Sequence, residues 1–232
     1  MLDYKKYSFP LLAEMPVKPD MDIIKRFLER DDLVWEDPFT SQPGISMVNG
    51  EVAETTYETI DHLCLTGPLD NDDQVGILNP EQRRDLSNKY WKDVSAKDKI
   101  KGDAGYLMNE YNWKHPLPFY KGTELHNHLT NLFEAPIIRV RYSKMKPGAF
   151  IPPHIDYNTT YAVRFIIPIE GSEGVVDRFW CRGEEFDFEM ENGKCYFLNI
   201  GFKHAVFHNG PKTRVYLIGS LGGQEDILPL LK

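Results

Sequence analysis

Short segments of strand character, separated by turn-forming residues, fill the second half of this sequence and constrain its fold more than any other feature. Each segment is rich in branched or aromatic side chains, and together they cover residues 137–142, 161–169, 178–181, 185–190, 194–200, 204–208 and 214–219. The separating turns include Lys146-Pro147-Gly148, Asn192-Gly193 and Asn209-Gly210-Pro211. Many short strands at this spacing predict an antiparallel sandwich or barrel.

Helix signals and loops share the first half of the chain. Asp20 and Thr123 are each expected to be the N-cap of a helix that carries one apolar stripe. Asn79-Pro80, a cap followed by a proline at the first helical position, predicts a third helix over residues 81–91.

Residues 36–80 are rich in turn formers and are expected to be loops, with short strands over 45–48 and 52–56. We predict a single domain, residues 1–232. In it, an N-terminal extension of helices and loops (1–134) forms a layer on a β core (135–222).

Composition limits the partners and the compartment. The 232 residues include 27 basic and 35 acidic side chains, and the net charge of −8 argues against nucleic acid as a partner. No stretch approaches 18 consecutive apolar residues and the N-terminus lacks the apolar run of a signal peptide, so no membrane partner is expected. Three widely separated cysteines fit neither a disulfide framework nor a zinc site. A cytoplasmic protein is the expectation.

The tripeptide His154-Ile155-Asp156 is the first candidate for a metal site. In an extended segment side chains alternate between faces, so His154 and Asp156 would point the same way. With one further histidine they would complete the set of two histidines and one carboxylate that holds non-haem Fe(II). Such tripeptides also occur by chance, so the third ligand decides the matter.

The run from His204 to Ile218 reads as two strands joined by a turn near Pro211. Pairing of these strands would place Arg214 roughly opposite Phe207 or His208. A small dicarboxylate that chelates a metal at His204 would then reach the guanidinium of Arg214, which can bind a carboxylate through two hydrogen bonds. His208, beside the turn, is expected to be solvated rather than a ligand.

Five fragments of the second half resemble one known pattern when they are taken together. They are Lys146-Pro147-Gly148, Ile151-Pro152-Pro153-His154-Ile155-Asp156, Arg164-Phe165-Ile166-Ile167-Pro168, Gly193-Lys194-Cys195-Tyr196-Phe197, and the run from His204 to Val215. This set resembles the 2-oxoglutarate/Fe(II)-dependent dioxygenase superfamily, and more closely its aspartyl/asparaginyl β-hydroxylase-like family. The resemblance covers roughly residues 135–220.

The resemblance implies a fold, a cofactor and a set of site residues. The fold would be a double-stranded β-helix, which is a cupin-like jelly-roll barrel, here with an N-terminal helical layer. His154, Asp156 and His204 would bind Fe(II). Arg214 would bind the distal carboxylate of the cosubstrate 2-oxoglutarate, with Ser143 as a second contact. Arg164 would meet a carboxylate of the cosubstrate or of the substrate.

The implied reaction is hydroxylation of a C–H bond of a small-molecule substrate by O2, coupled to decarboxylation of 2-oxoglutarate to succinate. The carboxylate ligand Asp156 is similar to that of bacterial members acting on free amino acids, and it argues against halogenation, which needs that position vacant. Alternatives are a peptide or protein hydroxylase of the aspartyl/asparaginyl type, a cupin-type metalloenzyme, and a non-catalytic jelly-roll binding protein. The sequence does not define the oligomeric state.

Four further residues carry expectations. Arg139 and Arg141 share strand parity with Ser143, so they would face the pocket and grip an anionic substrate if Ser143 points inward. A solvated sheet face is the commoner arrangement for such a pair. Trp180 and Cys195 are expected in the core.

Overall fold

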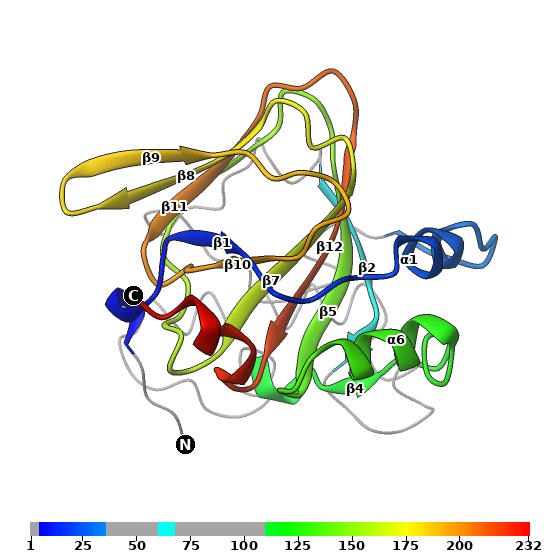
Figure 1. Ribbon diagram of the computed structural model, residues 1–232. Coiled ribbons are helices and arrows are strands. Elements are labelled where there is room, and N and C mark those ends of the chain that lie inside the picture. Colours follow the sequence, from blue (N-terminus) through cyan, green and yellow to red (C-terminus); the bar gives the residue numbers. More distant parts are fainter. Residues whose placement is uncertain (1–4, 36–59, 68–109) are drawn as a thin grey trace, which may run out of the picture.

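Two antiparallel sheets face each other in the computed structural model, which describes residues 5–35, 60–67 and 110–232 (Figure 1). The major sheet has the strand order β1-β10-β7-β12-β5-β2 and the minor sheet the order β6-β11-β8-β9. The strands of the two sheets are β1 (Leu12–Glu14), β2 (Ile60–Cys64), β5 (Ile137–Met145), β6 (Phe150–His154), β7 (Val163–Glu170), β8 (Val175–Cys181), β9 (Glu184–Phe188), β10 (Tyr196–Leu198), β11 (Lys203–His208) and β12 (Arg214–Leu221). A small third sheet pairs β3 (Thr66–Gly67) with β4 (His115–Pro116).

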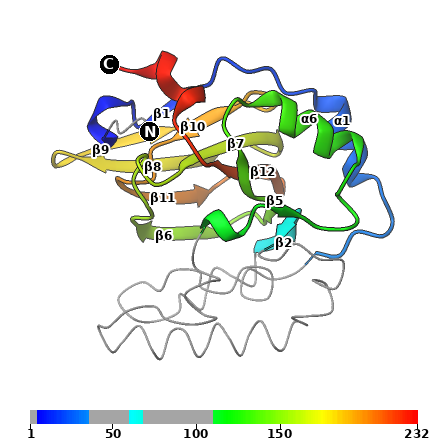
Figure 2. The ribbon, with the colours of Figure 1, turned by 90° about the horizontal axis from the view of Figure 1, so that it is seen from below.

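The connections between β5 and β12 define the fold. The chain alternates between the sheets from β5 to β8, turns back within the minor sheet through the β8–β9 hairpin, and alternates again from β10 to β12. Figure 2 shows β6, β11, β8 and β9 lying next to one another in that order. This is the winding of a double-stranded β-helix, so the predicted fold class, mainly β with flanking helices, is confirmed.

Side-chain alternation on the strands of the major sheet separates two apolar cores. On β12, Tyr216 and Ile218 face the minor sheet and join Phe179 and Val206 in the core between the sheets. Val215, Leu217 and Leu221 point the other way, into the core beneath the helices. A strand buried on both faces needs no polar positions, which is why β12 is apolar over most of its length.

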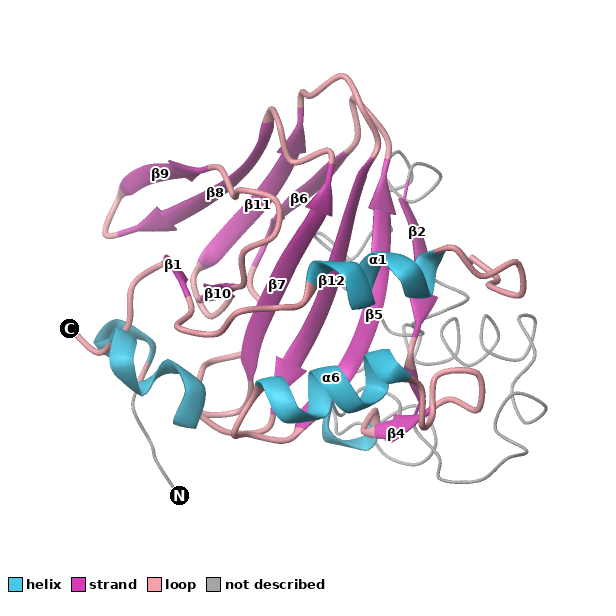
Figure 3. Ribbon diagram, turned by 45° about the vertical axis from the view of Figure 1, so that its right-hand side comes forward, coloured by secondary structure: helices cyan, strands magenta, loops and turns pink. Residues whose placement is uncertain are grey.

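Two helices cover the outer face of the major sheet, as Figure 3 shows. They are α1 (Met21–Leu28) and α6 (Glu124–Leu132). Both predicted N-caps are confirmed, since Asp20 accepts hydrogen bonds from the backbone of Asp22 and Ile23, and Thr123 accepts one from His126. The other helices of residues 5–35, 60–67 and 110–232 are short 3-10 turns, η1 (Lys6–Ser8), η3 (Glu110–Asn112) and η4 (Glu225–Leu230). Within the described part of the chain, no helix has the length and apolar character needed to cross a bilayer.

The N-terminal extension contributes strands as well as helices. β1 pairs with β10 at one edge of the major sheet, and β2 pairs with β5 at the other. Neither strand was expected. The helix expected over 81–91 and the strands expected over 45–48 and 52–56 lie outside the described residues. The single-domain assignment, with its boundary at residue 135, stays a prediction.

The run from His204 to Ile218 is not a hairpin, and that expectation was wrong. β11 pairs with β6 and β8 in the minor sheet, whereas β12 pairs with β5 and β7 in the major sheet. The turn near Pro211 therefore carries the chain from one sheet to the other. Arg214 faces the strand of His204 across the interior of the barrel instead of lying beside it.

The two expected core residues differ in outcome. Cys195 is fully buried in the core beneath the helices, as predicted. Trp180 lies on the outer face of the minor sheet, where its indole N–H donates to Glu185 at 2.8 Å, so its placement in the core was wrong. Parity explains the error, since Phe179 is the neighbour that points inward.

Candidate metal centre

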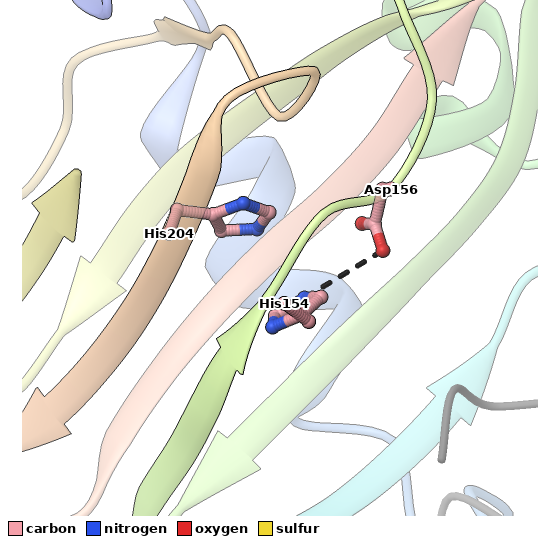
Figure 4. A group of neighbouring side chains, drawn as sticks. All are labelled: His154, Asp156 and His204. Carbon is pink, nitrogen blue, oxygen red and sulfur yellow. Dashed lines mark ion pairs between the residues drawn. The ribbon is translucent and has the colours of Figure 1, made fainter. Parts of the chain in front are cut away.

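His154, Asp156 and His204 converge at one end of the interior between the sheets, where one ligand atom from each lies within 4.8 Å of the others (Figure 4). Antiparallel pairing of β6 with β11 sets His154 directly opposite His204, with ring centroids 4.2 Å apart. Asp156 follows two residues after the end of β6, and its backbone N–H donates to Ile200. Its Oδ1 lies 3.6 Å from Nε2 of His154. The extended tripeptide thus presents both side chains to one point, as predicted.

Backbone carbonyls orient both imidazole rings. Nδ1 of His154 lies 2.7 Å from the carbonyl oxygen of Pro152, and Nδ1 of His204 lies 3.0 Å from that of Phe202. A carbonyl only accepts, so each Nδ1 carries the hydrogen. In the neutral ring the lone pair is then on Nε2, the atom available to a metal.

The protonation states suit metal binding. Burial, reinforced by the proximity of His154, lowers the pKa of His204 to about 4. Burial acts against ionisation of Asp156, but His154, His204 and Arg164 outweigh it, so the pKa of Asp156 lies below its ordinary value. The side chains of His154 and Asp156 keep 19% and 24% of their surface exposed, which leaves the centre open on one side. Two imidazoles and a carboxylate in this state fit Fe(II).

The other predicted site residues lie on the inner face of the major sheet. Arg214, the first residue of β12, is 2% exposed; its guanidinium lies 4.4 Å from the ring centroid of Tyr216, and its Nε has no hydrogen-bond partner among the described residues. Ser143 of β5 is buried beside Tyr216. Arg164 of β7 reaches Asp156, with Nη2 3.9 Å from Oδ2. These positions are compatible with the predicted roles, which stay predictions.

Arg139 and Arg141 face the interior, so the solvated sheet face was the wrong expectation for them. Arg139 is 8% exposed and forms an ion pair with buried Glu110. For Arg141, by contrast, no carboxylate among the described residues is within ion-pair distance, and its Nε is enclosed without a hydrogen-bond partner. Burial, together with Arg164 and Arg139, lowers the pKa of Arg141 to about 9. A guanidinium in this setting is a cation that lacks an anion.

Several inward-facing polar residues escaped the sequence analysis. Glu110 accepts hydrogen bonds from Ser220 at 3.1 Å and Tyr157 at 3.5 Å in addition to its ion pair with Arg139. His62 lies opposite Ser143 on β2, and Asp177 is buried on β8. Strand alternation signals Asp177, which stands between the inward Val175 and Phe179. No local signal marks Glu110, because its partners are distant in sequence.

His208 has a different environment from the one predicted. It is 1% exposed, not solvated, and its Nε2 lies 2.8 Å from the carbonyl oxygen of Lys212. Its Nδ1 accepts a hydrogen bond from the backbone N–H of Gly210 at 3.3 Å. Both ring nitrogens are engaged in the turn, and His208 is not part of the metal-ligand group.

The fold and this site together define a double-stranded β-helix protein with a potential metal centre of two histidines and one aspartate. The family model described as aspartyl/asparaginyl beta-hydroxylase matches residues 79–221. The chain therefore belongs to the aspartyl/asparaginyl β-hydroxylase family. None of the curated proteins matches the sequence.

Solved structures resemble the chain only distantly. An oxidoreductase of the 2OG-Fe(II) oxygenase family from Burkholderia pseudomallei is 17% identical, over 70% of this chain and 67% of its own, with a TM-score of 0.38. Oxalate oxidase in complex with the substrate analogue glycolate is 17% identical over 39% of this chain and 43% of its own, with a TM-score of 0.31. A cupin domain from Bordetella pertussis is 12% identical over 38% of this chain and 85% of its own, with a TM-score of 0.30. The chain thus spans less than half of the oxalate oxidase it matches, and these likenesses say nothing about its reaction.

Proposed function

We propose that this chain is an Fe(II)- and 2-oxoglutarate-dependent dioxygenase that hydroxylates an unactivated C–H bond of a small, carboxylate-bearing molecule such as a free amino acid. The observation that carries the proposal is the convergence of His154, Asp156 and His204, in a chain of the aspartyl/asparaginyl β-hydroxylase family. Ligands on one face leave the opposite face of an iron ion free for other molecules. When bound, iron and 2-oxoglutarate would supply the activation of O2 and the two electrons released on decarboxylation to succinate.

The residues of the chain hold and orient the reactants. The carbonyls of Pro152 and Phe202 keep Nε2 of His154 and His204 directed at the metal position. His154, His204 and Arg164 together lower the pKa of Asp156 and so favour its carboxylate form. Arg214, which is buried in the interior, would bind the distal carboxylate of 2-oxoglutarate, with Ser143 on the next strand as a second contact. Phe179 stacks against His204 at 5.6 Å and keeps water from that side of the ligand.

Arg141 supports the choice of an anionic substrate. Glu110 neutralises Arg139, and Asp156 lies near Arg164. Arg141 faces the same interior but has no counter-charge among the described residues. Arg141 is half-buried. A cation withdrawn from water is costly unless it is paired, so this site is suited to an anion supplied by a ligand. A carboxylate would bind Arg141 through two hydrogen bonds.

The proposal is tested with purified protein, Fe(II) and 2-oxoglutarate. Under anaerobic conditions a weak visible charge-transfer band is expected, and in air succinate should form only when 2-oxoglutarate is present. Arg214→Met should raise the 2-oxoglutarate requirement at least tenfold, since it removes a charge-assisted pair. Arg178→Met, at a half-buried arginine on the outer face of β8, is the matched control and should not change the 2-oxoglutarate requirement. If neither the charge-transfer band nor 2-oxoglutarate-dependent succinate formation is observed, the proposal is wrong.

The substrate class is tested by stimulated turnover. Free amino acids, their amides, and peptides containing Asp or Asn are each added, and 2-oxoglutarate consumption is measured. Free carboxylates should stimulate consumption and the matched amides should not. Arg141→Met should abolish this difference while leaving unstimulated consumption intact. Stimulation by the peptides alone would instead favour the peptide hydroxylase.

A further inference from the structure

Asp177 is a buried acid at the distal end of the interior that the proposed function leaves without a role. It stands on the inner face of β8 beside Val206 of β11 and is 2% exposed. Phe179, the next inward residue of β8, stacks against the metal-ligand candidate His204. Asp177 is therefore two residues, or roughly 6.6 Å of strand, farther from the metal position than Phe179.

Asp177 and Arg214 face each other without pairing. Oδ2 of Asp177 and Nε of Arg214 are both buried with no hydrogen-bond partner among the described residues. Arg214 nevertheless lies close enough to influence the ionisation of Asp177. Unsatisfied buried polar atoms are costly, so two of them in the same part of the interior indicate a polar ligand between them.

The proposed ligand of Arg214 is a carboxylate, and a second carboxylate beside it creates a conflict. Two carboxylates that share one site do not both ionise, because the repulsion raises the pKa of one of them. The neutral acid then donates its O–H to the remaining carboxylate in a short, charge-assisted hydrogen bond.

Building on the proposed function, we propose that Asp177 is a cosubstrate-binding residue: in its neutral form it donates its carboxyl O–H to the distal carboxylate of 2-oxoglutarate held by Arg214. Binding of the 2-oxoglutarate dianion to the enzyme with ionised Asp177 then takes up one proton from solvent. No other bond is made or broken.

The neighbouring titratable groups do not account for such a proton. His208 on β11 has both ring nitrogens engaged, and burial lowers its pKa. Tyr216 on β12 has a raised pKa because it is buried, so it stays neutral. Burial raises the pKa of Asp177 to about 6, although Arg214 acts against the rise. Asp177 is thus ionised at pH 8 before the ligand binds and is the group able to accept the proton.

The test is calorimetric titration of 2-oxoglutarate into the full chain loaded with Mn(II), with no turnover. Titrations at pH 8 in buffers of different ionisation enthalpy give the number of protons taken up. About one proton per 2-oxoglutarate is expected, and the affinity should fall about tenfold per pH unit between pH 7 and 8.

Asp177→Asn should bind 2-oxoglutarate with no proton uptake and no such pH dependence. Asp187→Asn, an exposed carboxylate on β9, is the matched control and should behave as the unmodified protein. 2-Oxopentanoate, which lacks the distal carboxylate, should bind without proton uptake.

Two outcomes would overturn the inference. One is binding of 2-oxoglutarate by the unmodified protein at pH 8 without proton uptake. The other is an unchanged proton uptake in Asp177→Asn. If 2-oxoglutarate binds to neither protein at any pH from 5.5 to 8, the proposed function itself fails, and the role of Asp177 fails with it.

Discussion

Buried titratable side chains concentrate around the proposed iron site, and their environments differ residue by residue. His204 and Asp156 are held in the states that bind a metal, one neutral and one ionised. Nε of half-buried Arg141 and Oδ2 of buried Asp177 have no hydrogen-bond partner among the described residues. Perturbed groups of this kind gather at functional sites, because the fold maintains them at a cost in stability.

Loss of one metal ligand should nearly abolish metal binding. His204→Ala removes one of the three ligands. Mutation of a group that only hydrogen-bonds to a metal ligand typically lowers metal affinity roughly 10–100-fold, so the affinity of this variant for Fe(II) or Mn(II) should fall by more than that. His128→Ala, on the surface helix α6, should keep the affinity of the unmodified protein. Calorimetric titration of the metal measures both. Comparable affinities in the two variants would remove His204 from the ligand set.

Asp177 should make the stability of the ligand-free protein depend on pH. Its folded pKa of about 6 lies above the unfolded value of about 3.9, so its contribution is fully present below pH 4 and is lost as pH rises through 6. About two pKa units correspond to roughly 3 kcal/mol. Asp177→Asn cannot ionise, so its free energy of unfolding should exceed that of the unmodified protein at pH 8 by up to roughly 3 kcal/mol. At pH 4 the variant should not be the more stable of the two. Urea unfolding at the two pH values measures the difference, and an equal difference at both would contradict the assignment.

Irregular segments, rather than the regular strands, set the positions of the site side chains. Arg139 has a φ of 49°, a left-handed conformation that non-glycine residues seldom adopt, where the register of β5 on β12 shifts. The register of β6 on β11 likewise shifts next to His204. The turn after β7 brings Gly171, with a φ of +68°, against the backbone of Thr213 and Arg214.

Gly171→Ala should disturb Arg214 from a distance. A Cβ there would collide with the carbonyl oxygen of Thr213 and come within 2.8 Å of the Cα of Arg214, in a backbone conformation that already disfavours alanine. Gly183→Ala is the matched control, with a φ of +85° but open space around the new methyl group. Both should lose about 1–3 kcal/mol of stability from backbone strain. Only Gly171→Ala should also weaken 2-oxoglutarate binding; equal binding by both variants would contradict the prediction.

The ion pair between η3 and β5 should stabilise the site strongly. Glu110→Gln leaves Arg139 buried without its counter-charge, which typically costs 3–5 kcal/mol. Glu124→Gln breaks the exposed pair between α6 and Arg26 of α1 and should cost at most about 1 kcal/mol. Chemical denaturation compares the two. Similar losses would mean that the buried pair does not carry the stability assigned to it.

At the scale of the molecule, the N-terminal segment is part of the barrel's support. Phe9, Ile24 and Phe27 are buried in the core beneath the helices, and β1 covers the edge of β10. Three such side chains contribute about 1.5–3 kcal/mol each, against a typical domain stability of 5–15 kcal/mol.

A chain that lacks residues 1–35 should therefore fail to unfold cooperatively, whereas the full chain should show one transition. Thermal unfolding followed by circular dichroism distinguishes them. A cooperative transition in the shortened chain would separate the N-terminal segment from the barrel and overturn the single-domain prediction.

The sequence by itself determined the features that depend on local physics. Strand-forming segments between turn formers located most strands of the barrel, and side-chain caps located α1 and α6. The tripeptide His154-Ile155-Asp156, together with the family resemblance that added His204, identified the candidate ligands. Each of these signals lies within a few residues of the chain or in a recognisable pattern. The site residues found in this way all lie in the interior between the sheets.

Only the tertiary structure decided which strands pair and which side chains lose water. Pairing of β11 and β12 with different sheets depends on contacts with β5, β6, β7 and β8 that no local pattern encodes. The burial of Asp177 and the neutralisation of Arg139 by Glu110 likewise depend on the assembled fold. Burial and charge compensation are properties of the assembled interior, because they depend on neighbours that the fold brings from distant parts of the chain.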